Sequence, residues 1–182
     1  RLVTAGYLEG FYYRPRIDMS LLEQHNEGLI ALSGCLGAEV PHKLVHNGRS
    51  AAMQALERYR GIFGDRYYLE MQKNEVGDQV TVNEGILEIS KHTGIPVVAT
   101  NDCHYLTRED ASLHDVLLCI QTNATRDQTN RFRFTGDTFY VRSPEEMAEL
   151  FSGVPQALAS TMEIAERCDL KLVFGQHQFP RF

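Results

Sequence analysis

Short apolar segments alternate with helical patterns in the first half of this chain, and this alternation restricts its fold more than any other feature. Residues 29–32, 67–71 and 96–99 are candidate buried strands. Residues 50–64 and 80–92 lie between them and repeat apolar side chains at helical spacing. Strands joined through helices pair in parallel, because the helix returns the chain to the same edge of the sheet. The sequence therefore predicts an α/β fold built on a parallel sheet or barrel.

Several residues are typical of helix ends. Asp18 and Ser50 are candidate N-caps, and Gly64 is a candidate helix stop. Thr107 with Asp110 resembles a capping box. It precedes a helix whose apolar spacing predicts an inner face of four residues: Leu113, Val116, Leu117 and Ile120.

The C-terminal third has a different character. Residues 122–136 are polar and irregular, and residues 138–141 are a further strand candidate. Ser143, followed by Pro144 and Glu146, predicts another helix start. A last helix is expected from Pro155 to about Arg167.

Bulk composition excludes several classes of protein. The net charge of −6 argues against a strong duplex-binding surface formed by this segment alone. Four scattered cysteines without a Cys-x-x-Cys pair are typical of reduced, intracellular thiols. No apolar run is long enough to span a membrane and no signal peptide is evident, so we expect a cytoplasmic protein. Since the chain starts at Arg1 rather than Met, we expect a piece of a longer protein.

Asp102 and His104 follow the strand candidate at residues 96–99 and are the strongest candidate metal ligands. Residues two apart in extended backbone point to the same side, so a carboxylate and an imidazole would project together. Chemistry in parallel α/β folds also gathers at the carboxyl ends of strands. In the alternative interpretation, Asn101 and Asp102 cap a turn and His104 is a half-buried structural ring.

Three further patterns have both a functional and a structural interpretation. Cys35 follows residues 29–32 in the same relative place and is either a thiolate ligand or an inert thiol. His42 and His46, with Glu39 one turn earlier, could chelate a metal, but their pattern predicts that both face solvent. The remaining histidines lack partner spacing and are treated as structural: His25, His92, His114 and His177.

Cations alternate with aromatic residues at 12–16 and 131–134. Such a mixture suits phosphate contact and base stacking. It also suits a packed surface in which arginines pair with the abundant acids, and the latter is the default expectation.

Several longer segments resemble bacterial replicative DNA polymerase III alpha subunits, in order and at comparable spacing along essentially the whole chain. They are residues 10–18, 30–36, 98–105, 114–122, 139–147 and 164–168. The resemblance implies a polymerase-and-histidinol-phosphatase (PHP) domain, which is a distorted (β/α) TIM-like barrel with a metal cluster at the strand ends. Residues 1–125 would be the later part of that domain. Residues 126–182 would be its end and an α+β connection toward the polymerase palm.

The resemblance also implies ligands. Asp102 and His104 match the closing Asp-x-His motif of the family's cluster, and Cys35 matches its Ser-Gly-Cys position. Asp102 would bind or bridge divalent metals (zinc, manganese or iron), and the other two would complete their shells. The opening His-x-His motif is expected before Arg1 and the polymerase's catalytic aspartates after Phe182, so this chain alone should be inactive.

Three functions follow from the resemblance. The first is a metal-dependent 3′–5′ exonuclease within a replicative polymerase that uses magnesium, DNA, deoxynucleotides and replisome partners such as the sliding clamp. The second is a structural scaffold that docks a separate proofreading exonuclease. A free-standing phosphatase is disfavoured by the polymerase-type segments around Tyr12 and Phe139.

Overall fold

A parallel three-stranded sheet lies at the centre of the computed structural model, which describes residues 1–74 and 76–175. Its strands are β1 (Ala31–Leu32), β2 (Tyr67–Met71) and β3 (Val97–Ala99), in that spatial order. Ala31 pairs with Tyr67, and Leu69 pairs with Val97. The predicted α/β class and parallel pairing are confirmed. Among the described residues the sheet is open, and a closed barrel is not seen.

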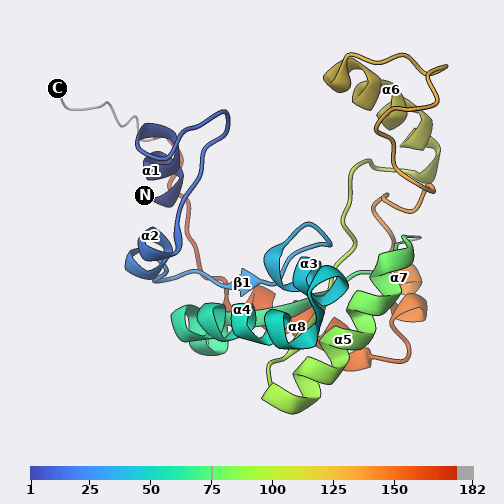
Figure 1. Cartoon of the computed structure of the whole chain (residues 1–182). Helices are drawn as coiled ribbons and strands as arrows, with labels where there is room; N and C mark the ends of the chain where they lie inside the picture. The colour runs from blue at the N-terminus through green and yellow to red at the C-terminus, as the bar shows by residue number, and fades with distance from the viewer. Residues whose placement is uncertain (75, 176–182) are drawn as a thin grey trace.

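Helices connect successive strands, as the alternation predicted (Figure 1). The chain passes from β1 through α3 (Glu39–His46) and α4 (Gly48–Phe63) to β2. It then passes through α5 (Gly77–Thr93) to β3. Gly64 and Gly94 end the two long helices with φ of 57° and 73°, a left-handed backbone that glycine adopts without steric cost.

One face of the sheet packs against these helices. Tyr67 and Leu69 are buried on this face, and the Tyr67 ring stacks on Tyr59 of α4 with 5.7 Å between ring centroids. From α5, the predicted inward positions are all buried: Val82, Ile86 and Ile89. This apolar cluster continues into the loop between the last two helices through Phe151 and Val154.

Tyr68 points to the opposite face and fastens the last helix, α8 (Pro155–Arg167), to the sheet. The buried Tyr68 hydroxyl donates to Glu163 at 2.6 Å and accepts from Arg167 at 2.7 Å. Burial, together with the hydrogen bond to Glu163, raises the pKa of Tyr68. In Figure 1, α8 lies behind α4 and α5, so the sheet is covered on both sides.

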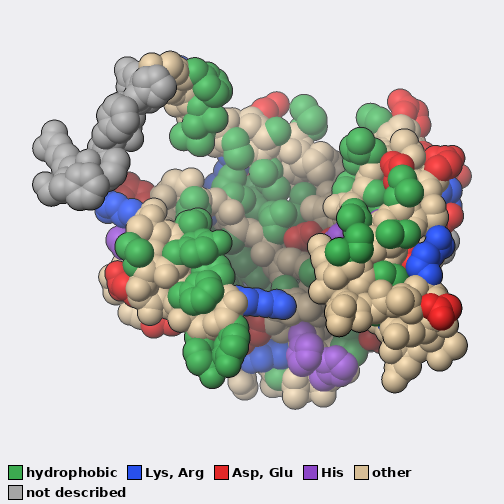
Figure 2. Space-filling view, turned by 90° about the horizontal axis from the view of Figure 1, so that it is seen from above, with side chains coloured by type: hydrophobic (Ala, Val, Ile, Leu, Met, Phe, Trp, Pro, Cys, Tyr) green, Lys and Arg blue, Asp and Glu red, His purple; other side chains and the backbone are tan. Residues whose placement is uncertain are grey.

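Two short helices form an N-terminal lobe, α1 (Leu2–Leu8) and α2 (Met19–Gln24). Asp18 caps α2 as predicted, because its carboxylate accepts from the Leu21 amide at 2.8 Å. Large apolar side chains of this lobe are exposed, among them Tyr7, Leu8 and Phe11. Figure 2 shows a hollow between this lobe and the lobe that carries α6, with hydrophobic side chains on both.

The capping patterns after β3 are present. Thr107 and Asp110 form the predicted box at the short 3-10 turn η2 (Arg108–Asp110), which leads into α6 (Ala111–Thr122). Ser143 and Glu146 form the second box at α7 (Pro144–Leu150). No helix in the described part of the chain is long and apolar enough to cross a membrane.

Two expectations for this region were wrong. Leu113, Leu117 and Ile120 are exposed, and the buried residues of α6 are Leu118 and Cys119. The reason is that α6 stands apart from the sheet (Figure 1), so its apolar stripe has no sheet to pack on. Residues 138–141 form no strand either, since Tyr140 makes only an isolated bridge with Tyr105.

Candidate functional site

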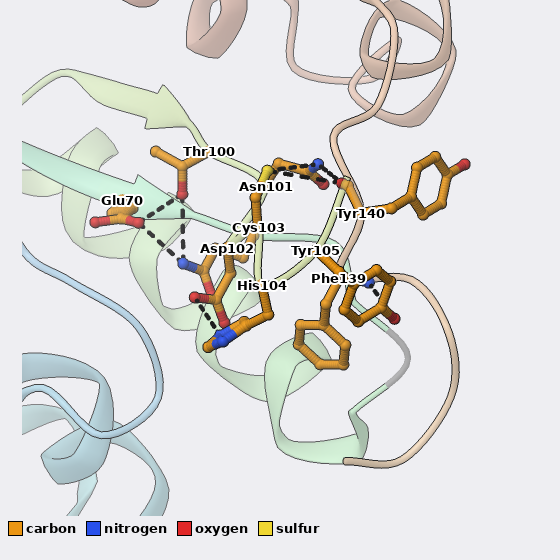
Figure 3. A network of polar contacts seen from close by, with 10 residues as sticks. Glu70, Thr100, Asn101, Asp102, Cys103, His104, Tyr105, Phe139 and Tyr140 are labelled. Carbon is orange, nitrogen blue, oxygen red and sulfur yellow. Dashed lines mark hydrogen bonds and ion pairs between the residues drawn. The ribbon is translucent and has the colours of Figure 1, made fainter. Parts of the chain in front are cut away.

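Glu70 joins the carboxyl ends of all three strands. Its carboxylate accepts from the Gly34 amide, just after β1, at 3.1 Å. It also accepts from the Thr100 hydroxyl, just after β3, at 2.5 Å. The Glu70 amide in turn donates to the Ser33 hydroxyl at 2.8 Å, and Gln72 donates to the same carboxylate at 2.9 Å. These bonds fix the loops that follow β1 and β3 relative to each other, and Figure 3 shows the bond between Glu70 and Thr100.

Asp102 and His104 face each other on the loop after β3. Nε2 of His104 lies 3.4 Å from Oδ1 of Asp102, and the two side chains are 36% and 29% exposed. They are therefore half-buried beside the Glu70 network and still open to solvent (Figure 3). The predicted juxtaposition of carboxylate and imidazole is present.

The backbone reason for this juxtaposition differs from the expected one. β3 ends at Ala99, and Asp102 adopts φ of 52° instead of extended backbone. A left-handed residue other than glycine costs free energy, although aspartate tolerates it better than most. The reversal at Asp102 turns the chain so that the imidazole returns toward the carboxylate. Such strained positions concentrate at functional sites.

Neighbouring segments hold this loop in place. The His104 amide donates to the Phe139 carbonyl at 2.7 Å, and the side-chain amide of Asn101 donates to the Tyr140 carbonyl. Arg142 donates to Oδ1 of the Asn101 side chain. The loop after β3 is thus tied to residues almost forty positions further along the chain.

Aromatic rings surround the His104 side chain. Its ring lies 4.7 Å from Phe134 and 5.7 Å from Phe139, both edge-on, and 5.6 Å from His114. Burial and the neighbouring His104 lower the pKa of His114. His114, which sequence reasoning treated as structural, therefore belongs to the surroundings of the site.

Cys35 lies on the loop after β1 and lines the same pocket as Asp102. It is exposed and in no disulfide, which argues against the inert buried thiol considered as its alternative. Gly34 precedes it with φ of 80°, and a Cβ there would lie 2.7 Å from the Ala38 side chain. This close approach explains a glycine immediately before the cysteine.

The donors present fit one side of a metal site. Carboxylate, imidazole and thiolate together are the ligand types preferred by zinc-like divalent metals. Within residues 1–74 and 76–175, no group of three histidine, cysteine or acidic side chains lies close enough to hold an ion by itself. In the described part of the chain, these side chains therefore do not make up a complete ligand set.

The second histidine candidate does not form a ligand set. His42 and His46 are exposed on α3, as predicted, with 4.4 Å between their ring centroids. Glu39 instead binds Lys43, Arg58 and Tyr59. Neither His25 nor His92 is among the residues that line the pocket of Cys35 and Asp102, and His177 lies outside the described residues.

Sequence reasoning missed Glu70 and Thr100. Glu70 sits within the otherwise apolar run Tyr67–Met71, and a carboxylate in a buried strand needs partners. A single acidic residue within an apolar strand could therefore have identified Glu70 as a candidate site residue.

Comparisons with known proteins show what this chain is similar to. The PHP domain family matches residues 1–74. DNA polymerase III subunit alpha of Borreliella burgdorferi is 43% identical over 175 residues, which cover 96% of this chain. The same subunit of Thermus aquaticus is 44% identical over 191 residues, and that of Deinococcus radiodurans is 42% identical over 187 residues, each covering 100% of this chain. The chain spans only 14–15% of the length of these relatives.

Proposed function

Because this chain matches the PHP region of the DNA polymerase III alpha subunit, we propose that it is part of a bacterial replicative DNA polymerase with a PHP-borne 3′–5′ exonuclease. One observation is the main support for the proposed nuclease activity. The Asp102 carboxylate and the His104 imidazole lie 3.4 Å apart at the carboxyl edge of a parallel sheet, in a pocket shared with Cys35. That edge is where α/β folds place their chemistry.

Three residues would hold the metal ions. Asp102 would bind or bridge them, and His104 and Cys35 would each contribute one further donor. Bound zinc, manganese or iron would activate water and stabilise the leaving oxygen of a phosphodiester. Further ligands would come from parts of the parent protein outside this chain, since the described residues hold no group of three.

The chain's own contribution is positioning. Glu70 holds the Gly34 amide and the Thr100 hydroxyl, and so positions the loops that bring Cys35 and Asp102 into the lining of one pocket. Phe134 and Phe139 contact the His104 ring edge-on, while its side chain stays 36% exposed. Preorganised ligands of this kind need little rearrangement when substrate arrives.

The remaining assignments belong to the same proposal. Residues 1–125 would complete a PHP barrel with earlier segments of the parent, and residues 126–182 would lead toward the palm. The parent would act in the cytoplasm on DNA and deoxynucleotides with magnesium, beside replisome subunits such as the sliding clamp.

A non-catalytic scaffold is the second candidate. It is favoured by the incomplete ligand set and by the apolar side chains exposed on the described surface, including Tyr7, Leu113 and Ile120. Contiguous exposed apolar surface is typical of protein interfaces. In this case the region would dock a separate proofreading exonuclease.

Substitution of Asp102 separates the two. In the parent polymerase, Asp102→Asn should reduce bound metal and lower 3′–5′ exonuclease activity at least about a hundredfold, with polymerase activity retained. Metal content measured by mass spectrometry and hydrolysis of a 3′-labelled oligonucleotide check this expectation. Asp169→Asn, an exposed carboxylate beyond α8, is the matched control. Equal metal content and equal hydrolysis in wild type and Asp102→Asn would favour the scaffold.

A further inference from the structure

An aromatic pocket lies directly over the candidate ligands. It has a volume of about 520 Å³, and Cys35 and Asp102 are among the residues that line it. Phe132, Phe134 and Phe139 line it together with Arg133. A volume of this size accommodates a small ring system, and most small-molecule pockets combine apolar walls with a few polar groups.

The segment that forms the aromatic wall is anchored from behind. Arg131 donates to both carboxylate oxygens of Asp115 on α6, at 2.6 and 2.8 Å, and its side chain is only 6% exposed. The hydrogen bonds from Arg131 hold the pKa of Asp115 below its usual range. Arg131 therefore pairs with an acidic residue, which is the structural role that was expected for the arginines of this segment.

The two residues that follow are directed differently. Phe132 is 58% exposed, and its ring meets Phe134 edge-on at 5.8 Å. The Phe134 ring in turn lies edge-on to the Phe139 ring, with 4.8 Å between their centroids, so the three rings form one continuous aromatic wall. Arg133 is exposed and forms no salt bridge within residues 1–74 and 76–175, although its charge contributes to the lowered pKa of Asp115.

We propose that this pocket binds the terminal nucleobase of a single-stranded DNA end, stacked on Phe132, with Arg133 at a neighbouring phosphate. The proposal rests on the proposed nuclease function, since it places the last phosphodiester next to Asp102. Base stacking on an exposed ring needs no particular sequence. A base within a duplex is already stacked and paired, so the pocket selects an unpaired end.

Charge supports a nucleic-acid strand over an apolar ligand. The chain carries a net charge of −6, so phosphates approach it favourably only where cations are locally in excess. Arg126, Arg131 and Arg133 share one segment, and only Arg126 and Arg131 pair with Asp115. Arg133 forms no such salt bridge among the described residues, and it is exposed where it lines the pocket, so its guanidinium can reach a phosphate there.

Cross-linking tests the contact directly. The probe is a thymine dodecamer with 5-iodouracil at its 3′ end, irradiated with the protein in EDTA so that hydrolysis does not intervene. We expect the cross-link to map to Phe132 or Phe134. The same strand annealed to its complement should cross-link about tenfold less.

Variants of the exposed residues provide the quantitative test. Phe132→Ala should weaken binding of the dodecamer about tenfold, and Phe132→Tyr should restore it. Phe11→Ala removes an aromatic side chain of similar exposure, 57%, from the N-terminal lobe and should have no effect. Arg133→Gln should reduce the slope of log affinity against log salt concentration by about 0.7.

The outcomes distinguish this proposal from the proposed function. A terminal cross-link at Phe132 in a protein without nuclease activity supports the pocket and counts against the nuclease. An active nuclease whose cross-links map elsewhere, with unchanged affinity in Phe132→Ala, overturns the pocket. Equal cross-linking of single and paired ends overturns the selection of unpaired ends.

Discussion

The sheet region, residues 31–99, and the site region, residues 100–142, are built in different ways. The sheet region is held by buried apolar side chains from strands and connecting helices, such as Leu56, Leu69 and Ile86. The site region has few buried apolar residues and is held by hydrogen bonds and ring contacts over long sequence separations. A hydrophobic core tolerates small shifts, whereas directional polar contacts fix side chains in one geometry. The apolar core of the sheet region therefore provides most of the folding stability, whereas the polar and ring contacts of the site region hold the candidate site residues in position.

The largest expected effect comes from the sheet region. Leu56→Ala removes a fully buried side chain of α4 and should lower the free energy of unfolding by about 2–5 kcal/mol. Leu117→Ala, in α6, removes a side chain that is 55% exposed and should change it by less than about 0.5 kcal/mol. Urea unfolding followed by circular dichroism measures both. Equal losses of unfolding free energy in the two variants would show that Leu117 is buried in solution, and would contradict the contrast between the sheet region and the site region.

Glu70 connects the two regions, and its substitution sharpens the comparison. Glu70→Gln places an amide against Gln72 and Thr100 and leaves at least one buried group without its partner. We expect a loss of about 1–3 kcal/mol of unfolding free energy, measured by urea titration. Glu88→Gln, which alters an exposed pair with Arg49, should change it by less than about 0.5 kcal/mol. No difference between the two variants would mean that the strand-end network is not formed.

Substitution of Tyr68 tests the hydrogen bonds that join the sheet to α8. Tyr68→Phe keeps the ring in place and removes its hydroxyl from Glu163 and Arg167. The expected loss is about 1 kcal/mol, and thermal unfolding should show it as a lower Tm. Tyr13→Phe removes a hydroxyl from a ring that is 84% exposed and serves as the control. A Tm lowered equally by both variants would argue against the contact with α8.

The smallest effect on global unfolding is expected for Asp115→Asn, because Asp115 and Arg131 lie outside the apolar core. The folded pKa of Asp115 lies below its unfolded value of about 3.9. The pair therefore stabilises the folded protein above that pH, and this stabilisation is lost as the pH falls through the folded pKa. Urea midpoints of wild type and Asp115→Asn should differ at pH 7, begin to converge below pH of about 4 and coincide below the folded pKa of Asp115. Midpoints that diverge on acidification would contradict the pairing.

Much of the fold followed from local patterns. The bounds of β2 and α8 agree with the sequence prediction, and Val82, Ile86 and Ile89 are buried as their spacing indicated. Apolar periodicity works there because those elements pack against one continuous core. The same reasoning failed for α6, whose periodic stripe is exposed, because periodicity identifies a face without supplying a partner for it.

The sequence by itself determined which residues are the candidates for the chemistry: Asp102, His104 and Cys35 follow strands, and strand ends meet at one edge of a parallel sheet. Only the tertiary structure decided how they are held. The left-handed turn at Asp102, the Glu70 carboxylate between two loops and the aromatic wall around His104 all depend on contacts between segments distant in the chain. Such contacts leave no periodic trace in the sequence, because their geometry arises only when the sheet brings the loops together.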